Sequence, residues 1–282
     1  MYTVHTIPQA RAFLDSARAR GQQVGLVPTM GFLHAGHQSL MRRAVSECDV
    51  VVATIFVNPL QFAPNEDLAA YPRDFVADSE LAAEAGVSIL LAPSVDEMYP
   101  ETVVTSVRVS GLSDGLESGA RPTHFEGVAT VVAKLFNVVG PCRAYFGEKD
   151  YQQLAVIRRM VSDLSFNIQV IGCPIVREVD GLAMSSRNAY LEAADREAAT
   201  CLRRALDAGV ALLEAGERSV VAIEAAMSAV VEAEDRATLD YVAVRDADTL
   251  QTIAQVEEDA HLLVAAKVGP SRLIDNCAFS GK

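Results

Sequence analysis

Residues 49–57, DVVVATIFV, are apolar almost throughout, and this run constrains the fold more than any other part of the chain. A strand without an alternating polar face is typical of the middle of a parallel sheet, because helices cover both faces of such a sheet. Short β-rich runs alternate with helix-period segments on either side of it. We expect strands at 24–28, 50–57, 87–92, 143–147 and 168–173, and helices at 8–20, 37–47, 67–85, 127–139 and 152–164. This alternation predicts an α/β fold with a doubly wound parallel sheet, in which ligands bind beyond the carboxyl ends of the strands.

The pattern changes at about Val176. The Ala-rich stretch 192–215 carries apolar residues at helical spacing, and strands are expected at 240–246, at 262–267 and at LIDN near the end of the chain. These elements predict a smaller α+β domain. We therefore expect two domains, at 1–175 and 176–282.

Composition excludes several classes of protein. The formal net charge is −13 and lysines and arginines form only short pairs, so we expect no nucleic-acid partner. No run of about 18 apolar residues is present, and the start MYTVHTIPQARAF lacks the pattern of a signal peptide, so we expect no membrane association. The five cysteines are scattered without a C-x-x-C pair, which favours reduced thiols and a cytoplasmic location.

The strongest functional signal is PTMGFLHAGH at 28–37, directly after the first expected strand. His34 and His37 are three residues apart where a helix begins, so both imidazoles would lie near free N–H groups and positive potential. Gly31 and Gly36 leave room for a nucleotide to approach the backbone. Unrelated surface histidines are the plain alternative, but two of only five histidines at this spacing favour a site for a reacting triphosphate.

Two further segments, 146–153 (FGEKDYQQ) and 180–188 (DGLAMSSRN), are candidate phosphate-binding loops. Lys149 provides a point charge for phosphate, and Asp150 can accept from ribose hydroxyls. The second segment offers two hydroxyls and Arg187, a suitable set for holding phosphates once a loop closes. Taken singly, these segments are equally consistent with a charged turn and with a Ser-rich loop that caps a helix.

Weaker candidates follow other expected strands. Asn58 and Gln61 come after the most apolar strand and can bind a hydroxyl- or carboxylate-bearing substrate. Asp78 is a candidate Mg²⁺ ligand, although a solvated acid on an acidic helix is the ordinary alternative. Residues 121–125 form a candidate mobile lid, or an exposed loop with no such role.

In order and spacing, the motifs VPTMGFLHAGH, IFVNPLQF, YPRD, RPTHFEGV, FGEKDYQQL, DGLAMSSRN and RLIDN resemble those of the pantoate–β-alanine ligases, within the H-x-G-H nucleotidyltransferase superfamily. The resemblance runs nearly from end to end. It implies a Rossmann-like domain, a smaller C-terminal domain that covers the site, and a homodimer. It also implies a two-step reaction, in which pantoate and MgATP give pantoyl-adenylate and pyrophosphate, and β-alanine then displaces AMP to give pantothenate.

The resemblance also implies roles for individual residues. His37 would be the proton donor, His34 would contact the phosphates, and Lys149 and Arg187 would complete the catalytic set. The ATP site would comprise Met30, Gly31, Phe32, Leu33, His34, Ala35, Gly36, His37, Gly147, Glu148, Lys149, Asp150, Val176, Met184, Ser185, Ser186 and Arg187. Gln61 and Gln153 would bind pantoate, Gln61 would also contact β-alanine, and Asp78 would be the metal ligand. Asp74 stands where the family often has a small hydroxyl residue, and this departure weakens the assignment of Asp78.

Three other functions use parts of the same motifs. Another H-x-G-H nucleotidyltransferase would share the histidines and the MSSR loop, but not the NPLQF and EKDYQQ elements. A relative of the aminoacyl-tRNA synthetases would need a basic face and an RNA-binding module. A nucleotide sensor without catalytic activity would not need His34, His37, Lys149 and Arg187 together.

Overall fold

The computed structural model describes residues 1–62, 68–69 and 71–281. Contacts divide the chain into two compact units. The N-terminal unit comprises Met1–Glu148 and Gln152–Pro174, and the C-terminal unit comprises Lys149–Tyr151 and Ile175–Lys282. Among the described residues, no helix is both long and apolar enough to span a membrane.

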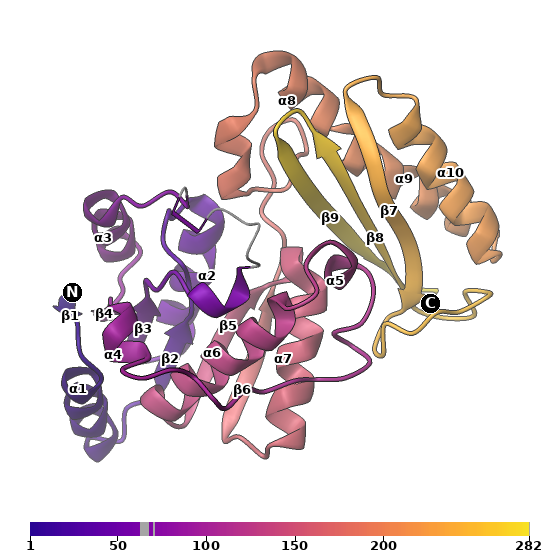
Figure 1. The fold of residues 1–282 in the computed structure, drawn as a ribbon. Helices are drawn as coiled ribbons and strands as arrows, with labels where there is room; N and C mark the ends of the chain where they lie inside the picture. Colours follow the sequence, from indigo (N-terminus) through magenta and orange to yellow (C-terminus); the bar gives the residue numbers. More distant parts are fainter. Residues whose placement is uncertain (63–67, 70, 282) are drawn as a thin grey trace. The chain divides into compact units, whose positions relative to one another are not determined.

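The N-terminal unit is built on a six-stranded parallel sheet with the order β1-β4-β3-β2-β5-β6 (Figure 1). The strands are β1 Tyr2–Val4, β2 Val24–Val27, β3 Val50–Thr54, β4 Ile89–Leu91, β5 Cys142–Gly147 and β6 Ile168–Cys173. The chain runs outward from β2 through β3 to β4 and then returns to place β5 on the other side of β2. This reversal makes the carboxyl ends of β2 and β5 the position where a doubly wound sheet binds its ligand.

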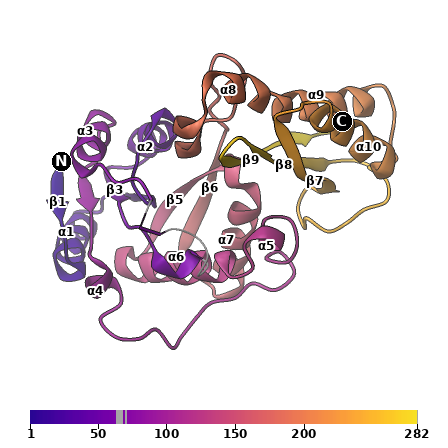
Figure 2. The ribbon, with the colours of Figure 1, turned by 45° about the horizontal axis from the view of Figure 1, so that its top comes forward.

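Helices cover both faces of this sheet (Figure 2). They are α1 Ile7–Ala19, α2 Ala35–Glu47, α3 Phe75–Glu84, α4 Val95–Met98, α5 Glu117–Ala120, α6 His124–Val139 and α7 Tyr151–Asp163, with the short 3-10 helices η1 Pro59–Gln61 and η2 Glu148–Asp150. Alternate residues of β3 face opposite cores. Val50 and Val52 pack with α1, α6 and α7, whereas Val51 and Ala53 pack with α2 and α3. The expectation of a strand buried on both sides is therefore confirmed.

The C-terminal unit is an antiparallel sheet of β7 Ala237–Asp246, β8 Ala260–Val268 and β9 Ser271–Phe279, with β8 in the middle. Helices α9 Cys201–Glu214 and α10 Val220–Glu232 pack on it, and Leu262, Val264 and Ala266 of β8 belong to the core that they share. Residue 261, one position out of phase with these three, points to the opposite face.

Several local expectations differ from the structure. The stretch 192–215 forms two helices, α8 Ala193–Ala199 and α9, instead of one. Helix α3 starts at Phe75, and the expected start at Asp67 lies outside the described residues. Strand β1 and helices α4, α5 and α10 are not predicted from the sequence, and β3 ends at Thr54 instead of Val57. The predicted fold class, a parallel doubly wound sheet followed by a smaller α+β part, is confirmed.

Candidate active site

The loop that follows β2 is tied to the end of β3. The backbone N–H of Thr29 donates to Thr54 Oγ1 (3.2 Å), and Thr29 Oγ1 donates to the carbonyl of Thr54 (2.5 Å). Gly31 then takes a φ of +87°, and Phe32 follows with a φ of +51°. A Cβ atom at Gly31 would lie 2.8 Å from Asp78 Oδ2, so this position requires glycine on both conformational and steric grounds.

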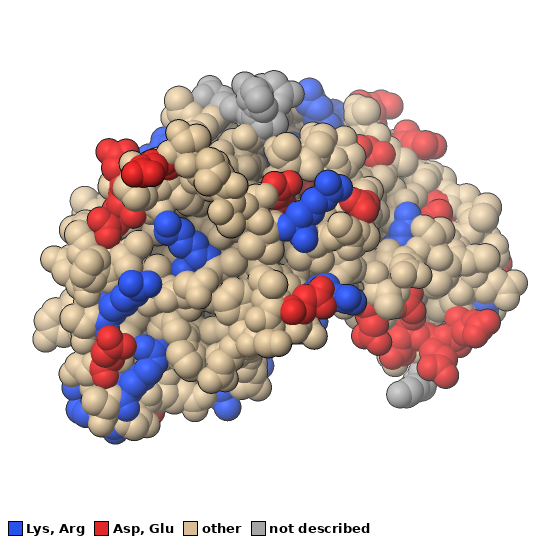
Figure 3. Space-filling view, turned by 60° about the horizontal axis from the view of Figure 1, so that its bottom comes forward, with Lys and Arg blue, Asp and Glu red and all other residues tan. Residues whose placement is uncertain are grey.

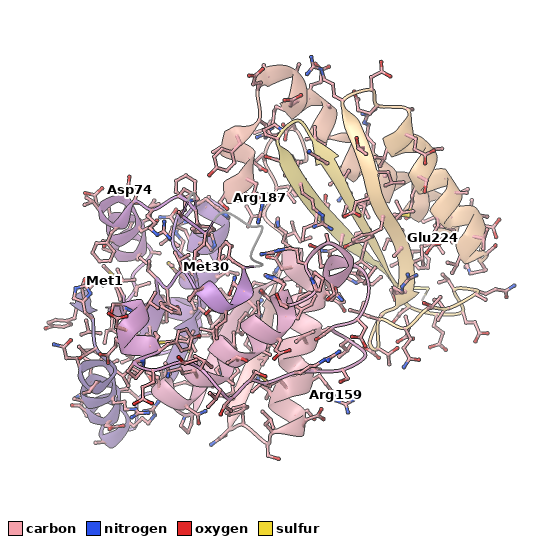
Figure 4. The ribbon with its side chains drawn as sticks, in the orientation of Figure 1. Met1, Met30, Asp74, Arg159, Arg187 and Glu224 are labelled. Atoms are coloured by element: carbon pink, nitrogen blue, oxygen red, sulfur yellow. The ribbon has the colours of Figure 1, made fainter. Side chains whose placement is uncertain are left out.

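Asp78 fixes the shape of the same loop. Its side chain is buried, and its two carboxylate oxygens accept from the backbone N–H groups of Phe32 (2.8 Å) and Leu33 (2.6 Å). Asp74 caps the helix that carries Asp78, because Asp74 Oδ1 accepts from the N–H of Ala77 (3.0 Å). The unusual Asp74 thus supplies the N-cap acceptor that a hydroxyl residue would otherwise provide. It is labelled in Figure 4.

The two histidines of the motif form a reciprocal cap at the start of α2. His34 is the N-cap residue, and its Nδ1 accepts from the N–H of Gly36 (3.2 Å). His37 Nδ1 accepts from the N–H of His34 (3.3 Å), and the two ring centroids are 4.0 Å apart. A ring nitrogen that accepts a hydrogen bond carries no proton, so in the neutral imidazoles the proton is on Nε2. Both rings are therefore set as Nε2–H donors beside the positive end of α2.

Polar contacts anchor the far half of α2 to the sheet. Arg43 donates to the carbonyl of Gly172 in β6 (2.8 Å) and pairs with Glu47 (3.0 Å). Tyr145 of β5 donates from its hydroxyl to Glu47 (3.0 Å), and the two bonds together hold the pKa of Glu47 below its usual value, with Arg43 the larger cause. The helix that presents the histidines is thus fixed across two strands.

Gln61 lies beside this loop. It is buried, and its Nε2 contacts the sulfur of Met30 at 2.9 Å. Asn58 donates to Gln61 Oε1 (3.3 Å) and to the carbonyl of Gly127 (3.0 Å). A Cβ atom at Gly127 would overlap the carbonyl oxygen of Leu60, so glycine allows α6 to approach η1 and bring Asn58 into reach. The structure thus brings Gln61 and Met30 together, and their roles in binding pantoate and ATP stay predictions. Met30 is labelled in Figure 4.

The two glutamines at the start of α7 differ in their surroundings. Gln152 is buried and holds the loop before α5, because it donates to the carbonyl of Leu112 (2.9 Å) and accepts from the N–H of Glu117 (3.1 Å). Gln153, the predicted pantoate contact, is half-buried. Gln152 therefore has a structural role that the sequence pattern did not reveal.

Other predicted nucleotide residues belong to the C-terminal unit. Lys149 and Asp150 lie in its short segment Lys149–Tyr151, and Lys149 Nζ is 3.5 Å from Asp150 Oδ1. Val176 and Met184 meet through a backbone hydrogen bond of 2.9 Å, which closes the hairpin before the MSSR loop. Ser185 caps the 3-10 helix η3 Ser186–Tyr190, its Oγ accepting from the N–H of Arg187 (3.3 Å). Arg187 is exposed (Figure 4).

The same unit carries a concentration of negative charge (Figure 3). The connection from β7 to β8 exposes Asp248, Glu257, Glu258 and Asp259. Such a surface repels a nucleic-acid backbone, in line with the net charge of −13.

A parallel sheet with its switch point at β2 and β5, and a histidine pair that caps the helix after β2, are the arrangement in which α/β proteins of the doubly wound class bind phosphate-bearing ligands. A model of the family described as pantoate-beta-alanine ligase matches residues 2–278. The chain belongs to the pantoate–β-alanine ligase family.

Individual relatives agree with this assignment over their full lengths. The pantothenate synthetase of Moorella thermoacetica is 52% identical over 276 residues, 98% of each chain. A crystal structure of pantothenate synthetase from Thermus thermophilus has a TM-score of 0.93 at 48% identity and covers 98% of this chain and 99% of its own. The Francisella tularensis ligase, solved with beta-gamma ATP and β-alanine, has a TM-score of 0.79 at 34% identity, with coverage of 98% and 97%. These matches favour a ligase over the three alternative functions.

Proposed function

We propose that this chain joins pantoate to β-alanine in two steps, through a pantoyl-adenylate. The observation that carries the proposal is the reciprocal histidine cap, which uses Nδ1 of both rings as acceptors and so leaves Nε2 of both as the donor nitrogens at the start of the helix after β2. The Francisella relative was solved with both beta-gamma ATP and β-alanine, which supports ATP and an amine as substrates here. A carboxylate is a poor electrophile, so adenylation must precede attack by the amine.

In the first step, a carboxylate oxygen of pantoate attacks the α-phosphorus of ATP, and the bond to the β-phosphate oxygen breaks to release pyrophosphate. Negative charge grows on the phosphoryl oxygens, and fixed donors lower the barrier without reorganising. His34 and His37 donate from Nε2, while Lys149, Ser185 and Arg187 serve the phosphates. The proton-donor role predicted for His37 requires a protonated ring, and that form would lose the bond from the His34 N–H, so the cap favours hydrogen-bond donation.

In the second step, the amine of β-alanine attacks the acyl carbon and the bond to the phosphate oxygen of AMP breaks. Gln61 and Gln153 are proposed to bind pantoate, with Gln61 also near β-alanine. The contact of Gln61 with Met30 supports a pantoate site beside the nucleotide loop. Water must be kept away, because the mixed anhydride would otherwise hydrolyse. Residues 121–125 are proposed as a lid, and Arg121 and His124 already donate to the carbonyl of Gln61 (3.3 and 3.1 Å).

Magnesium is proposed to accompany ATP. Among the described residues, no three His, Cys, Asp or Glu side chains come together as a metal cage. Mg²⁺ commonly binds through one or two carboxylates and the substrate's phosphates, so the residues present fit an ion held mainly by ATP. Asp78 retains lone pairs beyond its two N–H bonds and is the proposed protein ligand. When bound, the ion would offset charge on the phosphates.

Two proposals concern the whole molecule. All five cysteines are free thiols, which supports a cytoplasmic, reducing location. The family resemblance supports a homodimer. Sedimentation equilibrium would test the dimer, and a single species at the monomer mass of 30.2 kDa over the micromolar range would refute it.

Pantoate labelled with ¹⁸O in its carboxylate tests the reaction. Release of pyrophosphate must depend on pantoate, and one labelled oxygen must appear in AMP once β-alanine is added, because the carboxylate oxygen that attacks phosphorus leaves with AMP. Unlabelled AMP would refute the adenylate. Release of pyrophosphate without pantoate would indicate another nucleotidyltransferase.

A further inference from the structure

The segment Lys149–Tyr151 lies between β5 and Gln152 of the N-terminal unit in sequence, yet it packs with the C-terminal sheet and belongs to that unit. Asn276 of β9 donates from Nδ2 to the carbonyl of Lys149 (2.7 Å). The ring of Tyr151 stacks on His261 of β8, with ring centroids 3.4 Å apart and planes inclined by 11°, and its hydroxyl donates to the carbonyl of Ala247 (3.0 Å). The residues on both sides of Asp150 are therefore fixed to the sheet.

His261 sets the direction of Asn276. Asn276 Nδ2 donates to the Lys149 carbonyl, so Asn276 Oδ1 faces His261, and His261 Nε2 donates to it (2.9 Å) and holds the amide in this orientation. A flipped amide would place its carbonyl oxygen against the Lys149 carbonyl and its NH₂ against the histidine N–H. Both His261 and Asn276 are buried, which removes competing water. The result is one directed chain of two hydrogen bonds from His261 to the Lys149 backbone.

The buried imidazole of His261 lowers the stability of the folded C-terminal unit. The other residues of β8 up to Ala266 are apolar and buried, whereas His261 Nδ1 is buried and has no hydrogen-bond partner among the residues that the structure describes. A buried polar atom without a hydrogen bond opposes folding. Burial is also the main reason why the pKa of His261 falls to about 4, so the ring is neutral near pH 7, and its single proton is on Nε2 because that nitrogen faces the side-chain carbonyl oxygen of Asn276. An apolar side chain could fill the space and stack on Tyr151, but it could not orient Asn276.

We propose that His261 and Asn276 are positioning residues, which hold the backbone of Lys149 so that its side chain is placed for the ATP phosphates. This inference rests on the proposed function of Lys149. His261 acts on Asn276 through its N–H, Asn276 acts on Lys149 through its amide, and neither touches substrate. The phosphate lysine is thus set by the C-terminal sheet and not only by the strand that precedes it.

The test is a double-mutant cycle of Asn276→Ala with Lys149→Ala, read as pantoate-dependent pyrophosphate release. Asn276→Ala alone should lower kcat/KM for ATP about tenfold or more, because a small displacement of a catalytic group is costly, while the KM for pantoate stays unchanged. In the Lys149→Ala background the same change should have almost no further effect. His261→Leu should match Asn276→Ala, whereas His261→Gln, which keeps an N–H donor, should recover part of the loss.

Val264→Ala is the matched control, since Val264 is a fully buried β8 residue that faces the helices and not Tyr151. It should destabilise the unit and leave the kinetic constants of the folded enzyme unchanged. Independent, additive effects of Asn276 and Lys149, or an equal kinetic loss in Val264→Ala, would overturn the inference. If the wild type itself shows no pantoate-dependent turnover, the proposed function fails. In that case ATP affinity is measured by calorimetry for the same variants of Asn276 and Lys149. Additive losses of affinity in the double variant would again refute the positioning role.

Discussion

Replacing His37 by glutamine separates the observed capping of α2 by this side chain from its proposed hydrogen-bond donation to the reacting phosphate. In a capping box, glutamine at the third helical position reaches back to the N-cap backbone N–H. His37→Gln should therefore keep the bond from His34 N–H that His37 Nδ1 now accepts at 3.3 Å. His37→Ala removes both the acceptor and the ring.

The expected magnitudes differ for stability and rate. The lost bond is long, so His37→Ala should lower the free energy of unfolding by about 0.5–1 kcal/mol, whereas His37→Gln should be close to neutral. Both variants lose the imidazole donor, and both should slow adenylation by roughly 10²–10³, the usual cost of removing one fixed donor to the transition state. Ser39→Ala is the control, because it removes another hydrogen bond of the first turn, from Ser39 Oγ to the Gly36 carbonyl (2.7 Å), and leaves both rings in place.

The assay is single-turnover release of pyrophosphate from ATP and pantoate, alongside urea unfolding followed by circular dichroism. A near-normal rate in His37→Gln with a slow His37→Ala would refute the reasoning. In that case His37 would act only by shaping the helix start, and the transition-state donor would have to be sought elsewhere.

Three further predictions concern the loop after β2 and the C-terminal sheet. Asp78→Asn should lower the free energy of unfolding by about 2 kcal/mol, because the NH₂ group of the new asparagine would face a backbone N–H. If the variant needs the same Mg²⁺ concentration as the wild type at saturating ATP, Asp78 is not the metal ligand. Gly31→Ala should abolish ATP binding and cost at least about 1–2 kcal/mol in unfolding free energy, from its positive φ and its contact with Asp78; normal ATP affinity by calorimetry would show that the loop tolerates a side chain. Burial lowers the pKa of His261 from 6.5 to about 4, so below pH 6.5 the unfolded chain binds this proton more readily than the folded one. The free energy of unfolding should thus fall by about 2 kcal/mol from pH 7 to pH 5 through this group, and His261→Phe should lose that part of the fall; equal pH slopes in urea unfolding would refute it.

Most of the parallel sheet could be predicted from the sequence, because its signals are local. Strand β3 is apolar on both sides, and PTMGFLHAGH announces both the end of β2 and the start of α2. Strand β1 has three residues and gives too short a pattern. Helix α10 was missed because its sequence, VVAIEAAMSAVVE, is apolar over most of its circumference and shows only a weak helical stripe.

The sequence predicts the site residues that lie in its motifs, but not the residues that hold those motifs in place. The roles of Asp78 and Gln152 depend on backbone groups that are far away in sequence and carry no residue-type signal. The stack of Tyr151 on His261 joins positions 110 residues apart, and nothing in HLLVAAK distinguishes a functional histidine from an ordinary core residue. Position in the folded sheet, and not sequence spacing, identifies these groups.

The placement of Lys149–Tyr151 limits how this enzyme can be taken apart. A fragment ending at residue 174 would contain the lysine but none of Asn276, His261 and Ala247, which fix its neighbourhood. A chimera that joins the parallel sheet to the C-terminal unit of another protein would also lose these contacts, unless the new unit has residues that bind the Lys149–Tyr151 segment in the same way. The two units are therefore not interchangeable modules, and recombination between distant relatives should succeed only when β5–α7 and β8–β9 are inherited together.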